Sequence, residues 1–230
     1  MTPVRAVSAT SITLFGRAYR WTVTLIAVCL VGAVTLALAP LGPLAAHMSA
    51  HILLMNAVAP TVAVAALNWP PAAFAYRMAG GSLVLASVAQ VGVLWIAHSP
   101  PLMAASMSSH SLHVAIQFAL LATALWFWFA VLGQSGSARW RAIVALLLTG
   151  KLFCLLAALL VFAPRALYPV ELAHVHHGAA ADPLADQYLA GLLMLVVCPL
   201  TYVLAGVLIA ERWLRELRER DAILPPLPWR

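Results

Sequence analysis

Eight histidines are the residues of this chain best suited to hold a metal ion. Two pairs stand at helical spacing: His47 and His51 are four residues apart, and His110 and His113 are three apart. Residues at these spacings share one face of an α-helix, so each pair can present two imidazoles to the same point. Met55 follows His51 by one turn. Imidazole with thioether suits copper, and the thioether favours Cu(I). The pattern therefore predicts a metal site, with copper as the first candidate.

The composition shows what kind of molecule must position these pairs. Hydrophobic residues make up 64% of the 230 residues, and only 9% are charged. A soluble domain is about 45–50% apolar and about 25% charged, so this chain has too few charges to cover a water-facing surface. A soluble enzyme, a disordered chain and a fibrous protein are excluded. We predict an all-α polytopic membrane helical bundle, and we interpret the net charge of +6 as a topology signal, with no nucleic-acid partner.

Six apolar runs are long enough to cross a bilayer as helices of about 20 residues. Proline pairs and Gly/Ser clusters separate the runs, as expected of loops. The predicted spans are residues 21–39, 47–67, 82–98, 110–132, 140–163 and 186–210. The chain then divides into an N-terminal segment (1–20), a six-span membrane domain (21–210) and a helix extension with a Pro-rich tail (211–230). The first run also has features of a signal peptide, but Pro40 directly after its small residues argues against cleavage.

The arginines give the bundle a direction. Eleven of them fall on the side of the two termini, whereas Arg165 alone falls on the other side. Cytoplasmic loops of membrane proteins carry the excess of Lys and Arg, so we predict that both termini are cytoplasmic. With the acidic residues included, the formal charge is +7 inside and −2 outside. On this topology all eight histidines lie at the outer ends of spans or in outer loops.

Several spans can contribute to one outer metal site. His98 ends the third span, Asp186 begins the sixth, and Met194 follows two turns further on. A helical bundle can converge such residues. The candidate metal ligands are His47, His51, His98, His110, His113, Asp186, Met55 and Met194. The alternatives are ordinary hydrogen bonding for a histidine, packing for a methionine, and a helix N-cap or a histidine-orienting acid for Asp186.

Other residues in apolar surroundings leave their interpretation open. Lys151 lies deep in the fifth span, where it can snorkel to the interface, be hydrogen-bonded in its neutral form, or have a function. The last outer loop holds three histidines that form either a metal-capture segment or a polar loop: His174, His176 and His177. The three cysteines form no CxxC motif. Each is interpreted as a small buried residue, with a soft metal ligand or transfer thiol as the alternative.

Three segments carry longer motifs. Residues 47–60 contain HMxxHxLLM followed by Ala-Pro, residues 95–128 contain WxxHxP, His110, His113 and a Phe-Trp pair, and residues 184–194 contain LxDQxLAGLxM. Together they resemble the multi-pass CtaG-type cytochrome c oxidase assembly factors over about residues 46–203. The resemblance implies a role in terminal-oxidase maturation through copper supply on the outer side, with His47, His51, His98 and Asp186 in the site. Family members commonly have seven spans and a wider spacing of the span-four histidines, so the choice between His110 and His113 stays open.

The leading interpretation is a copper-handling assembly protein without turnover chemistry, in the bacterial plasma membrane. It would hold copper, as Cu(I), and pass it to a terminal oxidase subunit, with a periplasmic copper carrier as a further partner. One alternative is a haem-binding membrane oxidoreductase, in which two histidines on different spans serve as axial ligands. Another is a metal transporter, for which polar groups within the spans are few: Asn56, Gln90, Gln117 and Lys151.

Overall fold

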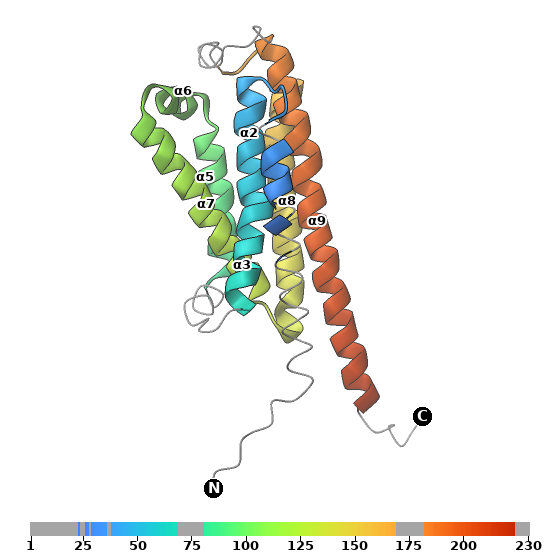
Figure 1. Ribbon diagram of the computed structural model, residues 1–230. Coiled ribbons are helices and arrows are strands. Elements are labelled where there is room, and N and C mark those ends of the chain that lie inside the picture. The colour runs from blue at the N-terminus through green and yellow to red at the C-terminus, as the bar shows by residue number, and fades with distance from the viewer. Residues whose placement is uncertain are drawn as a thin grey trace.

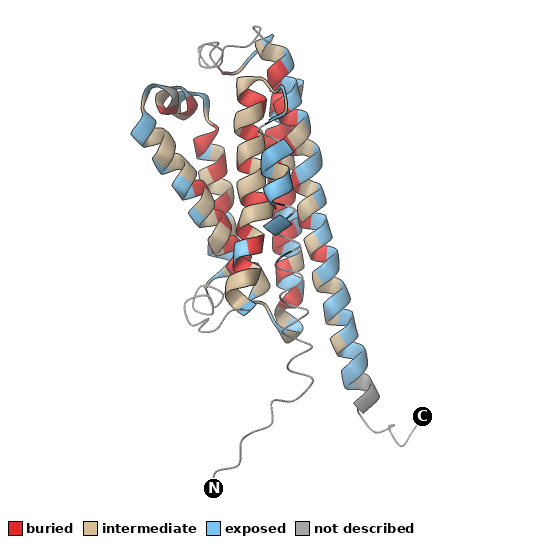
Figure 2. Cartoon of the chain, in the orientation of Figure 1, coloured by how far each residue is buried: buried red, intermediate tan, exposed pale blue. Residues whose placement is uncertain are grey.

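The structure is a computed structural model. It describes residues 23, 26–27, 29–35, 38–68, 81–168 and 182–223, with the side chains of residues 107 and 221–223 left out of the description. All regular secondary structure in these residues is helical, which confirms the predicted fold class. The long helices run side by side as an elongated bundle (Figure 1). Buried residues lie on the helix faces turned toward one another, whereas the outward faces and the far end of the last helix are exposed (Figure 2).

The elements follow one another with short connections. They are α2 (Pro43–Leu53), η1 (Leu54–Val58), α3 (Ala59–Asn68), α5 (Leu83–Ala97), α6 (Pro100–Ser108), α7 (His110–Leu132), η2 (Gly136–Ala138), α8 (Arg139–Phe162) and α9 (Pro183–Ile223). Residues 29–35 are also helical and belong to the first predicted span. The start of α2 and the whole of α6 lie at the same end of the bundle, which we call the α6 end (Figure 1).

Four described segments are long and apolar enough to cross a membrane: Pro43–Asn68, His110–Leu132, Gly136–Phe162 and Pro183–Arg220. The bent pair Leu83–Ala97 and Pro100–Ser106 is a fifth candidate. These segments coincide with the second to sixth predicted spans. Because seven of the nineteen residues of the first predicted span lie outside the described residues, the total of six stays a prediction, as does the cytoplasmic placement of the termini.

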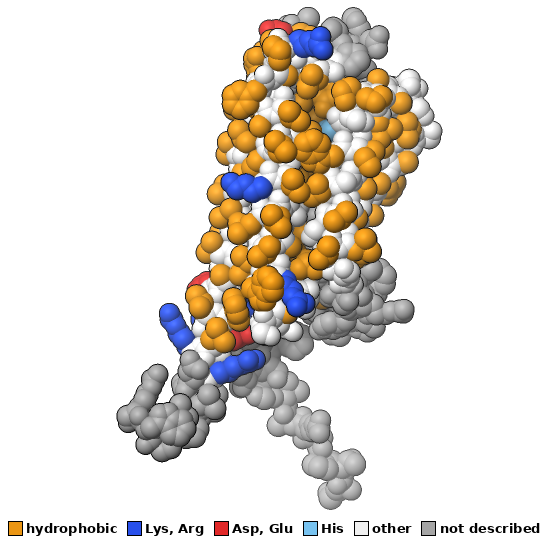
Figure 3. Space-filling model, turned by 180° about the vertical axis from the view of Figure 1, so that it is seen from behind, with side chains coloured by type: hydrophobic (Ala, Val, Ile, Leu, Met, Phe, Trp, Pro, Cys, Tyr) orange, Lys and Arg blue, Asp and Glu red, His pale blue; other side chains and the backbone are white. Residues whose placement is uncertain are grey.

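Apolar side chains cover most of the face drawn in Figure 3, and charged side chains gather mainly toward the end opposite α6. Large hydrophobic residues are exposed along the spans, for example Leu148 on α8 at 60% and Leu200 on α9 at 66%. Such a surface is stable in lipid and not in water. The chain is therefore a multi-pass membrane protein.

A π-turn interrupts the helix that runs from α2 to α3. The Ala59 N–H donates to the Leu54 carbonyl, one residue further back than in an α-helix. Because Pro60 has no N–H, the Met55 carbonyl is left without a donor from its own helix. The Trp128 indole Nε1–H of α7 donates to that carbonyl at 2.9 Å. Two motif residues, the proline and the tryptophan, thus act together to allow this wider turn.

The third predicted span ends in a corner. Ser82 caps the start of α5 by accepting the Leu85 N–H, and His98 ends the helix. Pro100 then starts α6, and the axes of the two helices differ by 72°. Proline fits the first turn of a helix but cannot continue a preceding one. His98 is thereby fixed at the bend.

Small residues allow α8 and α9 to lie close together. A Cβ atom on Gly191 would stand 2.7 Å from Val161 Cγ2 and 3.1 Å from the Ala157 carbonyl oxygen. One on Gly150 would stand 3.3 Å from Tyr202 Cβ. Close backbone approach at small residues is a common basis of helix packing in membranes. The glycine of the third motif, Gly191, is explained by this contact.

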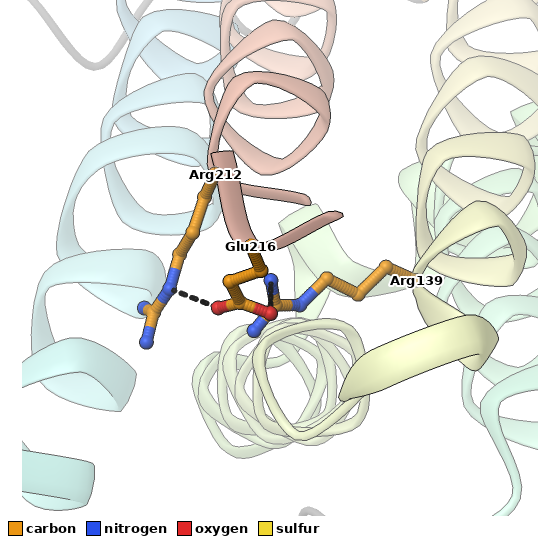
Figure 4. Close-up of polar contacts among 3 residues, drawn as sticks. All are labelled: Arg139, Arg212 and Glu216. Carbon is orange, nitrogen blue, oxygen red and sulfur yellow. Dashed lines mark ion pairs between the residues drawn. The ribbon is translucent and has the colours of Figure 1, made fainter. Parts of the chain in front are cut away.

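Beyond the sixth predicted span, α9 continues to Ile223. In this part of the helix Arg212 pairs with Glu216, and Arg215 pairs with Glu211, each at i,i+4 spacing. Glu216 also pairs with Arg139 at the start of α8, with Nη1 and Oε2 2.6 Å apart (Figure 4). This inter-helix pair joins α8 to α9 at the end opposite α6.

Candidate metal centre

Three histidines meet near the α6 end of the bundle. Each of His47, His51 and His98 offers a ring nitrogen, and the three atoms lie within 4.8 Å of one another. The Nε2 atoms of His47 and His51 are 2.9 Å apart. The ring centroid of His98 is 5.4 Å from that of His51 and 6.4 Å from that of His47. Small side-chain rotations would let all three reach one ion, so the predicted convergence of the second and third spans is present.

His98 is held in a defined orientation. Its Nδ1 lies 2.8 Å from the Leu94 carbonyl oxygen, which can only accept, so Nδ1 carries the proton. The neutral ring then has its lone pair on Nε2, a buried atom without a hydrogen-bond partner. Histidines that bind metals usually donate their other N–H to a carbonyl or carboxylate in this way. The ring is therefore oriented as a ligand would be.

The backbone of His98 is also fixed. The Tyr168 hydroxyl donates to the His98 carbonyl oxygen at 2.9 Å. Burial raises the pKa of Tyr168 to about 12, so its hydroxyl keeps the proton that it donates. The segment after α8 thus positions the corner between α5 and α6.

His51 provides the second unpartnered nitrogen of the cluster. It is 4% exposed, and its Nδ1 has no hydrogen-bond partner. A buried polar group without a partner costs about 1–3 kcal/mol, and buried side-chain polar atoms are usually bonded. His98 Nε2 offers a lone pair, and His51 Nδ1 offers one in the tautomer whose Nε2–H donates to His47, so the pocket would be completed by something that accepts lone pairs. A metal ion does so.

The two histidines of α7 are placed differently. The His113 ring centroid lies 5.6 Å from that of His47, and its Nε2 is 3.3 Å from Gln117 Nε2. His110 is exposed. The structure therefore brings His113 to the edge of the cluster and leaves His110 outside it.

A small cavity lies on the inner side of the imidazoles. Its volume is about 10 Å³, which is room for a single water-sized body. Sulfur-bearing residues form much of its wall: Met48, Met55, Met194 and Cys198. His51, His98 and Asn56 also line it. Met55 and Met194 were predicted as candidate ligands from their spacing, and the fold places both of them around this one cavity.

Asp186 occupies another position. Its Oδ2 accepts the Leu44 N–H at 2.8 Å, and its Oδ1 accepts the Ala45 N–H at 3.1 Å. It therefore caps α2 from a different helix, and it does not join the three-histidine group. A Cβ atom on Gly42 would overlap the carboxylate, so a glycine is needed for this close approach. The contact fixes the start of the helix that carries His47.

Gln187 makes a second set of structural bonds. Its Oε1 accepts the Leu167 N–H at 2.7 Å, and its Nε2 donates to the carbonyl of Leu160 at 3.1 Å. These bonds hold the segment that follows α8, which also carries Tyr168. The Asp-Gln part of the third motif is thus explained by two adjacent clamps.

The remaining predicted residues lie elsewhere. Lys151 is exposed on the outside of α8 and makes no ion pair with the described residues. The three histidines of the last outer loop, His174, His176 and His177, lie outside the described residues. Of the other residues in the cavity wall, Met48 and Asn56 were not predicted as ligands, and Cys198 was predicted as one only as an alternative. Their common signal is helical spacing: Cys198 follows Met194 by four residues, on the same face of α9.

These observations define a class of protein: a multi-pass helical membrane protein with a buried imidazole cluster near one end of its bundle. The family model for the cytochrome c oxidase caa3 assembly factor (Caa3_CtaG) matches residues 2–216. The chain belongs to this family, which confirms the resemblance drawn from its motifs. No curated protein and no solved structure matches the chain.

Proposed function

We propose that this chain binds copper at His47, His51 and His98 and supplies it to cytochrome c oxidase during assembly of the enzyme. The observation that carries the proposal is the pair of buried, unpartnered imidazole nitrogens within a group of three histidines. Membership of an oxidase assembly family gives the proposal its context. In this view copper is cargo, and the protein performs no turnover chemistry.

The choice of copper rests on the donor set. Imidazole alone suits zinc, copper, iron and nickel, whereas thioethers favour Cu(I). Met48, Met55 and Met194 line the cavity next to His51 and His98. Imidazoles and thioethers around one small space favour Cu(I) over Zn²⁺ or Mg²⁺.

Release to a partner requires ligands that can be exchanged. His47 is the least buried member of the group, and His113 stands 5.6 Å away by ring centroid. An ion held by His47 can therefore be approached from the α6 end. The arginine distribution supports an outer location for that end in a bacterial plasma membrane. We infer that a periplasmic copper carrier delivers the ion there and that an oxidase subunit accepts it.

The two alternatives find less support. Ligand pockets of drug size occupy about 300–1,000 Å³, far more than the cavity of about 10 Å³ that adjoins His51 and His98, so a haem macrocycle has no room beside them. A transporter would need polar groups along one path. Gln90 is instead bonded to Tyr202, and Lys151 lies on the outside of α8.

Copper binding by purified protein tests the proposal. We expect about one tightly bound copper per chain or more, and loss of the tight site in the His47→Ala/His51→Ala variant. His110→Ala is the matched control, because His110 is exposed and outside the cluster. In a strain that lacks the chromosomal gene, the control should restore oxidase activity and the double variant should not. Equal copper binding by the wild type and the double variant would overturn the proposal.

A further inference from the structure

The inner cavity has sulfur on two facing helices. Met55 comes from η1, four residues after His51, and Cys198 follows Met194 by four residues on α9. Residues at this spacing are stacked on one helix face. Two rows of potential ligands therefore face each other across the cavity, His51 with Met55 on one helix and Met194 with Cys198 on the other.

The inner end of this cavity is closed by aromatic side chains. Tyr202, the next residue four positions along α9, is completely buried, and its hydroxyl accepts from Gln90 Nε2 at 2.8 Å. The rings of Phe127, Trp128 and Phe153 pack around it, with centroids 5.5 to 5.8 Å from its own. An ion that passes the histidines can go no deeper than Cys198.

Charge singles out Cys198 among the wall residues. A Cu(I) ion held only by imidazoles and thioethers keeps a charge of +1 inside the membrane, where an uncompensated charge is costly. Cys198 is the one residue lining the cavity that can become an anion. The nearest acidic residue of the third motif, Asp186, is already bonded to two backbone N–H groups of α2. A thiolate would make the complex neutral.

Asn56 supports this role. Its Nδ2 donates to Cys198 Sγ at 3.3 Å, and its Oδ1 is buried without a partner. An N–H donor on sulfur favours the thiolate over the thiol. Asn56 is 7% exposed and lines the same cavity as the sulfur atoms. Its unsatisfied oxygen is a second indication, independent of the cysteine, that the cavity receives a ligand.

We propose that Cys198, with the thioethers of Met55 and Met194, forms an inner position for Cu(I) below the histidine cluster. The proposal rests on the proposed function, because copper must first reach the histidines. Binding exchanges the thiol proton for the metal: Cys–SH and Cu⁺ give Cys–S–Cu and H⁺, with no change of oxidation state. The inner position selects Cu(I) and retains it as a neutral complex, and the histidines exchange it with partners.

Proton release distinguishes this position from the histidine site. At pH 7.5 an ordinary thiol with a pKa of about 8.5 is mainly protonated, and an ordinary imidazole with a pKa of about 6.5 is mainly neutral. Anaerobic titration of the purified full-length protein with Cu(I), followed by a pH indicator dye, should therefore release about one proton for each ion bound at the inner position. X-ray absorption of the loaded protein should show sulfur among the copper neighbours.

Three variants test whether the negative charge or the soft sulfur atom of Cys198 is needed to bind Cu(I). Cys198→Ser should abolish the proton release and weaken Cu(I) retention at least about tenfold, because the soft anionic ligand is lost. Cys198→Met should also abolish proton release but keep sulfur neighbours, since it supplies a neutral thioether. Cys154→Ser is the matched control, because Cys154 lies on α8 and does not line the cavity. The control should behave as the wild type.

The outcomes distinguish the two proposals. If the wild type binds no copper, the proposed function fails, and this inference fails with it. If copper binds at the histidines but proton release and sulfur scattering are the same in Cys198→Ser as in the wild type, the inner position alone is refuted. Loss of proton release and a decrease in sulfur neighbours in Cys198→Ser, with both signals unchanged in Cys154→Ser, supports it.

Discussion

Two groups of buried polar side chains lie near the α6 end of this bundle and differ in one respect. Asp186 and Gln187 are fully bonded: both carboxylate oxygens and both amide groups have backbone partners. His51 and His98 are equally buried, but each has a ring nitrogen without a partner. Buried polar groups that are satisfied hold a fold together, whereas lone pairs left unpaired in a defined orientation are available to a ligand.

The residues of the third sequence motif have different structural tasks. The LxDQxLAGLxM segment contains a cap for α2, a clamp for the segment after α8, a close helix contact at Gly191, and a cavity residue at Met194. Three of these four tasks position the metal centre without touching it. Most of this motif thus builds the site without entering it.

The largest effect is expected from removing an unpaired nitrogen. His98→Leu should raise the Kd for Cu(I) by more than about 100-fold, or about 2.8 kcal/mol, because His98 alone supplies the ligand from α5. Stability should change little, because leucine removes the unpartnered Nε2 together with the Nδ1–H bond to the Leu94 carbonyl. Competition with a Cu(I) chelator measures the affinity. An unchanged Kd would show that His98 is not a ligand.

A smaller effect, on stability, is expected when Asp186 is changed, because both of its carboxylate oxygens are hydrogen-bonded. Asp186→Asn loses the charge and one of two acceptors, and the free energy of unfolding should fall by about 2 kcal/mol. The Kd for copper should change less than about threefold, because the carboxylate lies outside the histidine group. Unfolding in detergent and the chelator titration give both numbers. Loss of copper affinity at unchanged stability would make Asp186 a ligand after all.

Gly42→Ala tests the same clamp from the other side and should cost about 1–2 kcal/mol. The new Cβ would displace the Asp186 carboxylate from the α2 amides. In an Asp186→Ala background, which removes the overlapping atoms, the alanine should therefore cost much less, and a double-mutant cycle measures the difference. Gly92→Ala is the control: a Cβ there meets nothing within 4 Å, and in a helix interior it should stabilise by about 0.5–1 kcal/mol. Additive losses in the cycle would contradict the clamp.

The smallest effect is expected at the opposite end. Glu216 is partly exposed and pairs with the exposed Arg212 and the buried Arg139, and salt screens ion pairs that solvent reaches. Glu216→Gln should therefore lower the unfolding free energy less than Asp186→Asn does, and the difference should shrink at high salt. Copper affinity should stay the same. A loss comparable to that of Asp186→Asn would show that the bundle is held equally at both ends.

Apolar run length and proline positions were sufficient to predict most helices. The predicted fourth span coincides with α7, and the fifth differs from α8 by one residue at each end. The pairing of His47 with His51 followed from helical spacing. These predictions succeeded because lipid makes a helix the only economical local structure for a long apolar run.

Contacts between distant segments could not be predicted in this way. Aspartate is a common helix N-cap residue, yet Asp186 caps α2, where its partner Leu44 lies 142 positions away in the sequence. The π-turn depends on an indole of α7 reaching the Met55 carbonyl. Cys198 has no motif of its own, and its place beside Asn56 arises only from the packing of α9 against the α2–α3 helix. Propensity and periodicity describe one helix at a time and contain no information about its neighbours.

The bend at His98 has a consequence for the surrounding membrane. α5 contains 15 residues and rises about 22 Å, whereas the hydrocarbon core of a bilayer is about 30 Å thick. The helix that carries one of three metal-facing imidazoles is therefore shorter than the lipid around it, while α7 and α8 are long enough to cross it. Mismatch of this kind is relieved by local thinning of the bilayer or by tilt. We expect the separation of His98 from the α2 histidines to respond to lipid chain length, so that acyl composition tunes how firmly the centre holds its ion.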